Sequence, residues 1–377
     1  MTESQAPPAP RKHWLDWQRG LAVLFMIQWH VLDGWRATDA IPPGGPGLAA
    51  FEALRWIGGL AAPGFLYMAG LSQALADDAL ERRGLGPGAR RRRALVRALE
   101  ILAIAWGVRL VLYLLSWWKP GALLDLTKVD VLDVIALGLA VSALCSVGRP
   151  RPLGAALAGA AGLAVVLATP LVASALHHLD GPGGPWRPPS RLADVGLAWL
   201  FGSQPRAVFC AFNWVGFAFV GSAAAPLARS TRRPLAWLAL AAAAYGIGWV
   251  TNRMPEVYAY QDFWRTSPSW FLMRVGFVLG LTAALQAVPD AAERGLRWLT
   301  LLGRQSLVAY VASVQLTYGA VAVPVKGKLS LGGTVAGMVF MAALTWVVCI
   351  AWERLQAFRR SRWAGRAGPR TVPAQGQ

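Results

Sequence analysis

Residues 15–35 read LDWQRGLAVLFMIQWHVLDGW, and this stretch decides the fold of the chain. It is long and apolar enough to cross a bilayer as a helix, because about 20 residues span the hydrocarbon core. It nevertheless keeps Asp16, Arg19 and His30. An ionisable side chain in hydrocarbon costs roughly 3 kcal/mol or more unless it faces protein or water. We therefore predict that this stretch is the first transmembrane helix and that its polar face carries the active site.

The polar residues of this stretch share one helical face. On a helix, Asp16, Arg19 and His30 fall within a stripe about 100° wide. Arg19 and His30 are almost in line, about 16 Å apart along the axis. Two other interpretations stay open: His30 can be a satisfied interhelical hydrogen-bonding group, and the two charges can snorkel to the interface.

The composition of the whole chain indicates a polytopic membrane protein. Of its 377 residues, 55% are hydrophobic and 15% are charged, against about 25% charged in soluble domains. The net charge of +18 would favour nucleic-acid binding in a soluble chain, but arginines in cytoplasmic loops account for it in a membrane protein. The three cysteines lie in apolar runs, so we expect no disulfide and no metal site.

The hydrophobic runs predict an all-α fold with about ten transmembrane helices. Their expected ranges are 15–35, 51–75, 95–118, 129–147, 153–175, 208–227, 235–250, 269–288, 305–323 and 331–352. Pro63 and Gly64 predict a kink in the second helix. We expect one transmembrane domain over residues 13–353, between a disordered tail at 1–12 and a basic, disordered tail at 354–377.

The distribution of basic residues predicts the orientation of these helices. With the N-terminus inside, the inner segments hold 24 of the 37 Lys and Arg residues and the outer segments hold 12. By the positive-inside rule, both termini are then cytoplasmic. The basic segment 81–97 also offers arginines to an anionic cofactor or to acidic lipid headgroups. Nucleic acid is not needed as a partner, and the Ala- and Arg-rich composition favours a bacterial inner membrane.

Three charged residues of the third and fourth predicted helices are further candidates. Arg109 lies near the middle of its span, where it is either one half of a buried ion pair or a charge that faces the substrate. Asp130 and Asp133 are three residues apart and share a helical face. They can cap the helix at its outer end, pair with Arg109, or orient His30.

The first stretch also resembles a known family. Its pattern L-D-x-x-R-G-x-A-x-x-x-M-x-x-x-H, from Leu15 to His30, resembles the first-helix signature of the transmembrane acyltransferase superfamily. That superfamily includes the heparan-alpha-glucosaminide N-acetyltransferase catalytic-domain family and the acyltransferase three family. Two later stretches point the same way: APGFLYMAGLS at 62–72 and GRQSLVAY at 303–310. Relatives often carry a second His three residues after Tyr310, where this chain has Ser313.

The resemblance implies a membrane-bound acyltransferase. The enzyme would transfer an acyl group, which we expect to be acetyl, from cytosolic acetyl-CoA. The acceptor would be a hydroxyl or amine of a sugar or glycoconjugate on the outer side. His30 would serve as general base or as acyl carrier. A carboxylate such as Asp33, Asp130 or Asp133 would hold the imidazole in its useful tautomer.

The sequence also offers candidate residues for binding the acyl donor, and it leaves other functions open. Arginine binds phosphates with charge-assisted hydrogen bonds, so Arg19, with its neighbour Asp16, and Arg109 and Arg304 are candidates for the acetyl-CoA site. The alternative is a multi-pass transporter or flippase, in which His30, Arg109 and the acids form a substrate or proton pathway. A catalytically inactive relative that serves as an assembly partner is a third possibility.

Overall fold

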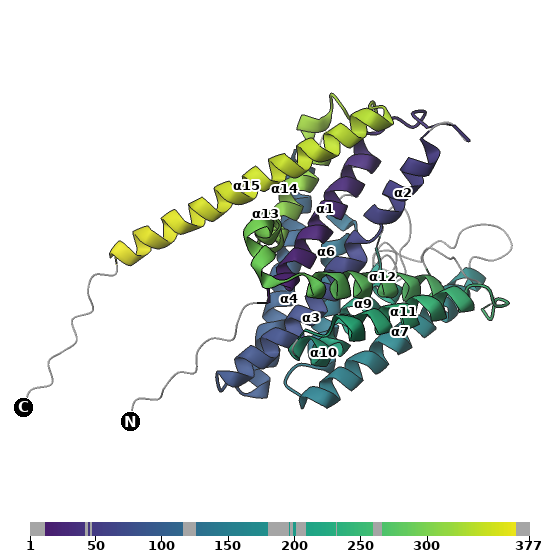
Figure 1. The fold of residues 1–377 in the computed structure, drawn as a ribbon, viewed down its shortest axis with the longest axis vertical. Helices are drawn as coiled ribbons and strands as arrows, with labels where there is room; N and C mark the ends of the chain where they lie inside the picture. Colours follow the sequence, from purple (N-terminus) through teal and green to yellow (C-terminus); the bar gives the residue numbers. More distant parts are fainter. Residues whose placement is uncertain are drawn as a thin grey trace, which may run out of the picture.

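The described chain is helical throughout. The computed structural model describes residues 12–41, 44–45, 47–115, 126–179, 196, 199–200, 209–230, 232–258 and 266–366. Within these ranges no strand occurs, and the one β-type contact is an isolated parallel bridge between Arg36 and Leu329 (Figure 1). The predicted all-α class is therefore confirmed for this part of the chain.

The helices follow the predicted order. They are α1 His13–Trp35, α2 Leu48–Gly58, α3 Ala61–Arg82, α4 Pro87–Leu114, α6 Val131–Cys145, α7 Arg151–Leu179, α9 Ala211–Ala223, α10 Ala225–Arg229, α11 Pro234–Thr251, α12 Pro268–Ala287, α13 Glu293–Arg304, α14 Ser306–Tyr318 and α15 Leu331–Arg366. Two short 3-10 turns, η1 Asp290–Ala292 and η2 Ala320–Ala322, flank α13 and α14.

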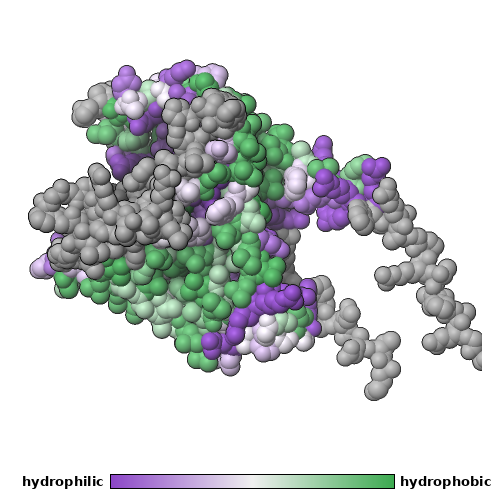
Figure 2. Space-filling view, turned by 180° about the vertical axis from the view of Figure 1, so that it is seen from behind, coloured by the Kyte–Doolittle hydropathy of each residue, from purple (hydrophilic) through white to green (hydrophobic). Residues whose placement is uncertain are grey.

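Several of these helices are those of an integral membrane protein. In the described residues, four helices are long and apolar enough to cross a bilayer, namely α7, α11, α12 and α15. Large apolar side chains are also exposed on α4, among them Leu99, Trp106 and Leu114. Figure 2 shows a broad hydrophobic face with hydrophilic residues gathered at its edge. Ten spans and two cytoplasmic termini stay predictions.

The predicted second helix is two helices. The break between α2 and α3 lies at Gly59 and Leu60, so the expected kink at Pro63 and Gly64 is wrong. Pro63 stands in the first turn of α3, where a backbone N–H has no partner within the helix. Proline therefore costs nothing at this position.

Two stretches are more helical than expected. Residues 293–304, which were not predicted as a helix, form α13, whose leucines at 296, 299 and 302 recur at helical spacing. Their spacing was a usable signal. α15 continues to Arg366, beyond the expected end at Trp352. The residues just after Trp352 are mostly good helix formers, so the helix extends past its apolar part, and residues 354–366 are not a disordered tail. Residues 1–11 lie outside the described residues.

The first helix is the centre of the fold. α1 packs against α2, α3, α12, α13, α14 and α15 (Figure 1). Gly20 lies against the backbone of Leu299, and Gly303 lies against the backbone of Asp16, so neither position has room for a Cβ atom. The indole of Trp17 then donates to Glu293 Oε2 at 2.9 Å and to Thr300 Oγ1 at 3.0 Å. Glycine and a buried indole therefore hold α13 against α1.

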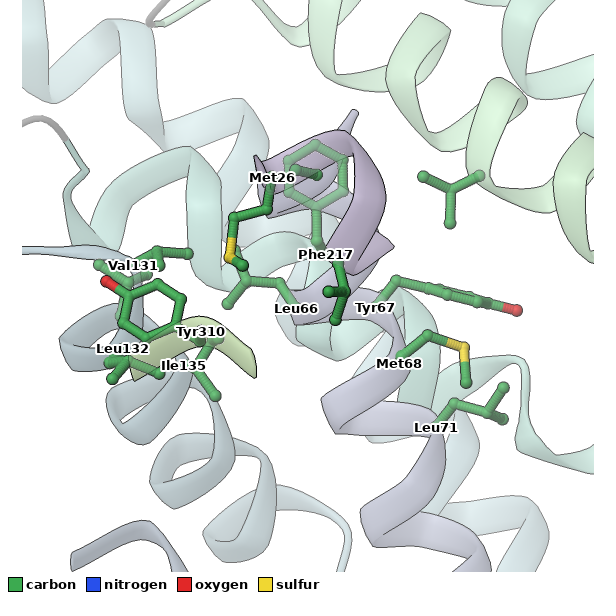
Figure 3. Close-up of a cluster of buried hydrophobic side chains, with 14 of the residues drawn as sticks. Met26, Leu66, Tyr67, Met68, Leu71, Val131, Leu132, Ile135, Phe217 and Tyr310 are labelled. Atoms are coloured by element: carbon green, nitrogen blue, oxygen red, sulfur yellow. The ribbon is translucent and has the colours of Figure 1, made fainter. Parts of the chain in front are cut away.

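A second close crossing joins α3 to α9. Gly70 lies against the carbonyl of Ala218, and Gly221 lies against the carbonyl of Tyr67. The hydroxyl of Ser222 donates to the carbonyl of Gly70 at 3.1 Å. Around this crossing, apolar side chains from α1, α3, α6, α9 and α14 form the cluster drawn in Figure 3.

Gly70→Ala tests whether this crossing is needed for stability. The added methyl group meets a backbone carbonyl, so we expect a loss of about 1–3 kcal/mol and a lower midpoint of thermal unfolding in detergent. Gly107→Ala is the matched control, because that glycine of α4 has open space around it. Equal midpoints for the two variants would contradict the role of the close approach.

Candidate active site

A cavity of about 460 Å³ lies between α3, α4, α6 and the start of α14. Arginines from three helices, α1, α4 and α13, line it: Arg19, Arg90, Arg93, Arg97 and Arg304. Much of the remaining wall is apolar, with side chains such as Phe65, Met68, Ile135 and Leu139. Along α6 the wall begins at Val131, and it ends at Val147 just beyond this helix, about 24 Å away. At one end of the cavity, Val147 lies beside Arg91, and we call this the basic end. At the other end, Val131 lies beside Tyr310, and we call this the tyrosine end.

The arginines at the basic end differ in their partners. Arg90 is buried and forms an ion pair with Asp77 at 3.3 Å. Arg97 is exposed and pairs with Glu100 at 2.9 Å. Arg93 is exposed and forms no ion pair within the described ranges. Arg93 is therefore the cavity-lining cation that is most readily available to an anionic ligand.

The predicted donor-binding residues lie in different places. Arg19 lines the cavity, donates to Ser72 Oγ, and pairs with the buried Asp16 at 3.4 Å. Arg304 also lines the cavity, where it is exposed and 3.4 Å from Glu353. Two of the predicted arginines thus share one cavity with residues of the basic segment 81–97.

Arg109 does not line this cavity, and it is one half of a buried ion pair. Its Nη1 donates to Asp133 Oδ2 and its Nη2 donates to Asp133 Oδ1 at 2.9 Å. The Arg109 side chain is 8% exposed and that of Asp133 is 0% exposed. Of the two alternatives for Arg109, the structure therefore gives the ion pair.

The two acids of α6 form a capping box. The side chain of Asp130 accepts from the backbone N–H of Val131 at 2.6 Å, and Asp133 accepts from the backbone N–H of Asp130 at 2.8 Å. Asp130 is thus the helix cap and Asp133 the partner of Arg109. Neither carboxylate has a hydrogen bond to His30 in the described structure.

Tyr310 connects this network to His30. Its hydroxyl donates to Asp130 Oδ2, and its ring lies edge-on to the imidazole of His30, with 6.3 Å between the ring centroids. Tyr310 also forms part of the cavity wall, whereas His30 does not. In Figure 3 the Tyr310 ring stands beside Val131 and Leu132 at the start of α6. Tyr310 therefore separates the tyrosine end of the cavity from His30.

A second tyrosine covers His30 on another side. The ring of Tyr318 lies edge-on at 5.5 Å from the imidazole, and its hydroxyl donates to Asp33 Oδ2 at 3.0 Å. Tyr318 therefore contacts both Asp33 and His30, and these two residues share no hydrogen bond in the described structure. The Nδ1 atom of His30 is buried and has no hydrogen-bond partner in the described part of the chain. Within the described residues, no hydrogen bond at this nitrogen fixes the tautomer of the ring.

The pairing of the two tyrosines was not predicted from the sequence. Tyr318 follows Tyr310 by eight residues, about two helical turns, so both lie near one face of α14. That spacing was the available signal. Ser313, which stands where relatives often have a second His, is fully buried, and its hydroxyl donates to the carbonyl of Tyr310 at 3.0 Å.

A comparison with known families now adds to this geometry. The sequence model of the family described as "Heparan-alpha-glucosaminide N-acetyltransferase, catalytic" matches residues 11–245, which is more than half of the chain. The matched part includes His30, the Arg109–Asp133 pair and the basic segment 81–97. No curated protein matches the chain significantly.

Arg109→Ala tests the buried ion pair. It leaves Asp133 as an unpaired buried carboxylate, so we expect a loss of about 3–5 kcal/mol in stability. The double variant Arg109→Met with Asp133→Asn removes both charges and should recover most of this loss, because an amide oxygen can still accept from Asp130. Thermal unfolding in detergent measures both variants. A double variant as unstable as the single one would show that the pair does more than neutralise two charges.

Proposed function

The chain belongs to the heparan-alpha-glucosaminide N-acetyltransferase catalytic family, a family of membrane acetyltransferases, and from this we propose its reaction. An acetyl group passes from cytosolic acetyl-CoA to a hydroxyl or amine of a sugar or glycoconjugate at the outer face of the membrane. His30 acts as general base or as acyl carrier. A bacterial inner membrane is the proposed location.

The observation that carries this proposal is the cavity with its two unlike ends. The arginine-lined end suits the phosphates of the donor, which guanidinium groups bind with charge-assisted hydrogen bonds. The apolar section suits the slender pantetheine arm. The thioester would then stand at Tyr310, one aromatic ring away from His30. Turning the Tyr310 ring aside would bring the thioester to the imidazole.

His30 can then move the proton that the reaction releases. Its neutral imidazole accepts a proton from the attacking hydroxyl or amine as the new bond to the acetyl carbon forms. The bond between carbon and sulfur breaks, and the proton passes to the thiolate of coenzyme A. If His30 is instead the acyl carrier, the imidazole nitrogen attacks first and the acceptor attacks second. The buried Nδ1 without a described partner is compatible with either role.

The exposed end of α1 is the proposed side for the acceptor. Asp33 is exposed there and is fixed by the hydroxyl of Tyr318. The arginine-rich ends of α3 and α4 lie at the opposite end of the bundle (Figure 1). A donor from the basic side and an acceptor from the side of Asp33 would therefore meet at His30.

One observation also favours the transporter alternative. His30, Tyr310, Asp130, Asp133 and Arg109 form a connected series of ionisable groups, which a proton pathway would use as well. An acyltransferase would move a labelled acetyl group from coenzyme A to another molecule, whereas a transporter would not.

His30→Ala distinguishes them. In membranes supplied with labelled acetyl-CoA, we expect transfer of label to a glycan or to the protein itself, and we expect at least a hundredfold loss in the variant. His13→Gln is the control, because His13 contacts Glu293 and not the cavity. Label transfer that survives His30→Ala would contradict the role of His30. Loss of solute uptake without any acyl transfer would instead support a transporter.

Arg93→Ala tests the donor site. We expect the KM for acetyl-CoA to rise about tenfold, because a charge-assisted hydrogen bond to phosphate is worth about 1.5–3 kcal/mol. The matched control is Arg92→Ala, since Arg92 is also exposed but does not line the cavity. Equal KM values for the two variants would show that the donor does not bind at this end of the cavity.

A further inference from the structure

A second cavity lies on another side of α1 and shares no residue with the first. It has a volume of about 510 Å³ and is formed by α1, α3, α11 and α12. Its wall is made of small and aromatic residues, including Ala22, Gly64, Gly280 and Phe277. Leu238 on this wall is 53% exposed, so the cavity opens onto the apolar outer surface of α11. We refer to it as the α11–α12 groove.

The chemistry of the groove selects an apolar occupant. The main polar side chain of the groove wall is Gln18. The nitrogen and the oxygen of its amide each already form a hydrogen bond. Gln18 Nε2 donates to the carbonyl of Val278 at 3.2 Å, and Thr282 Oγ1 donates to Gln18 Oε1 at 3.0 Å. The amide therefore offers little to a polar ligand, whereas the wall suits a hydrocarbon chain.

A buried cation stands next to one end of this groove. Arg274 is 4% exposed and precedes the groove residues Phe277 and Val278 by one turn of α12. Gly59 also lies close to Arg274, because a Cβ atom on Gly59 would be 3.4 Å from Arg274 Nη2. The next residue, Leu60, belongs to the groove wall. Arg274 and the groove are therefore contiguous.

The guanidinium of Arg274 has aromatic neighbours but no described counterion. It lies 4.9 Å from the Trp56 ring centroid and 5.6 Å from that of Trp270, and it donates to the carbonyl of Trp56 at 3.1 Å. No carboxylate of the described residues lies within ion-pair distance of it. A guanidinium has five N–H donors, and a buried charge without a counterion is costly. A phosphate at this position would supply both the acceptors and the opposite charge.

We propose that the α11–α12 groove binds an anionic phospholipid of the bilayer, with a hydrocarbon chain in the groove and the lipid phosphate on Arg274. The Trp56 ring connects the two parts, since it lies edge-on to Phe277 at 4.2 Å and also covers the guanidinium. The site is separate from the proposed acetyl-CoA cavity, so it stands whether or not that function is correct.

Native mass spectrometry of the purified full chain tests this site. After incubation with equal amounts of phosphatidylglycerol and phosphatidylcholine, we expect the wild type to retain one phosphatidylglycerol preferentially. Arg274→Gln should bind phosphatidylglycerol at least tenfold more weakly, while its amide can still donate to Trp56. Arg253→Gln is the control, because Arg253 stacks on Trp249 outside the groove.

A second variant covers the case in which Arg274→Gln does not fold. Gly280→Leu places a side chain in the groove, since a Cβ atom at this position meets only Ala241, at 3.8 Å. We expect it to lose the bound lipid while eluting as a folded protein in size-exclusion chromatography. The proposal is overturned if the wild type shows no preference for phosphatidylglycerol. It is also overturned if folded Arg274→Gln or Gly280→Leu retains that lipid as the wild type does.

Discussion

A guanidinium removed from water is costly without an anionic partner, and Asp133 is that partner for Arg109 inside the bundle. The pair joins α4 to α6 at the N-terminal turn of α6, where Asp133 also accepts from the backbone of Asp130. Asp130 is therefore held in position to accept from Tyr310. The geometry around His30 thus depends on an ion pair that has no hydrogen bond to His30.

The three stretches that carry the family resemblance meet around α1. Arg19 of the first stretch donates to Ser72 of the second, and Ala22 lies 3.5 Å from the Cβ position of Gly64. Gly303, which begins the third stretch, lies against the backbone of Asp16. Gly20, Gly70 and Gly303 of these motifs are therefore places where helices approach closely, and Arg19 and Ser72 meet beside the first cavity.

The two cavities differ in chemistry because α1 presents different residues to each. Arg19 lines the first cavity and Gln18 lines the second. Neighbouring residues on a helix point about 100° apart, so a single helix can border an arginine-lined cavity and an apolar groove. Each cavity has arginine beside an apolar section, which is the arrangement expected for ligands that combine phosphate with a slender or hydrocarbon part.

The sequence by itself determined the helical class, most of the helix order and the polar face of α1, because these follow from hydrophobic runs and from residue spacing along one helix. It also indicated that Asp130 and Asp133 share a face, and it left open whether they cap, pair or orient. Only the tertiary structure decided between these roles, since the partner of Asp133 lies on α4 and that of Asp130 lies on α14. The division of residues 48–82 into two helices and the position of Tyr310 between the cavity and His30 were likewise decided by packing. Periodicity describes one helix at a time, whereas a site built from several helices depends on how their faces are turned toward one another.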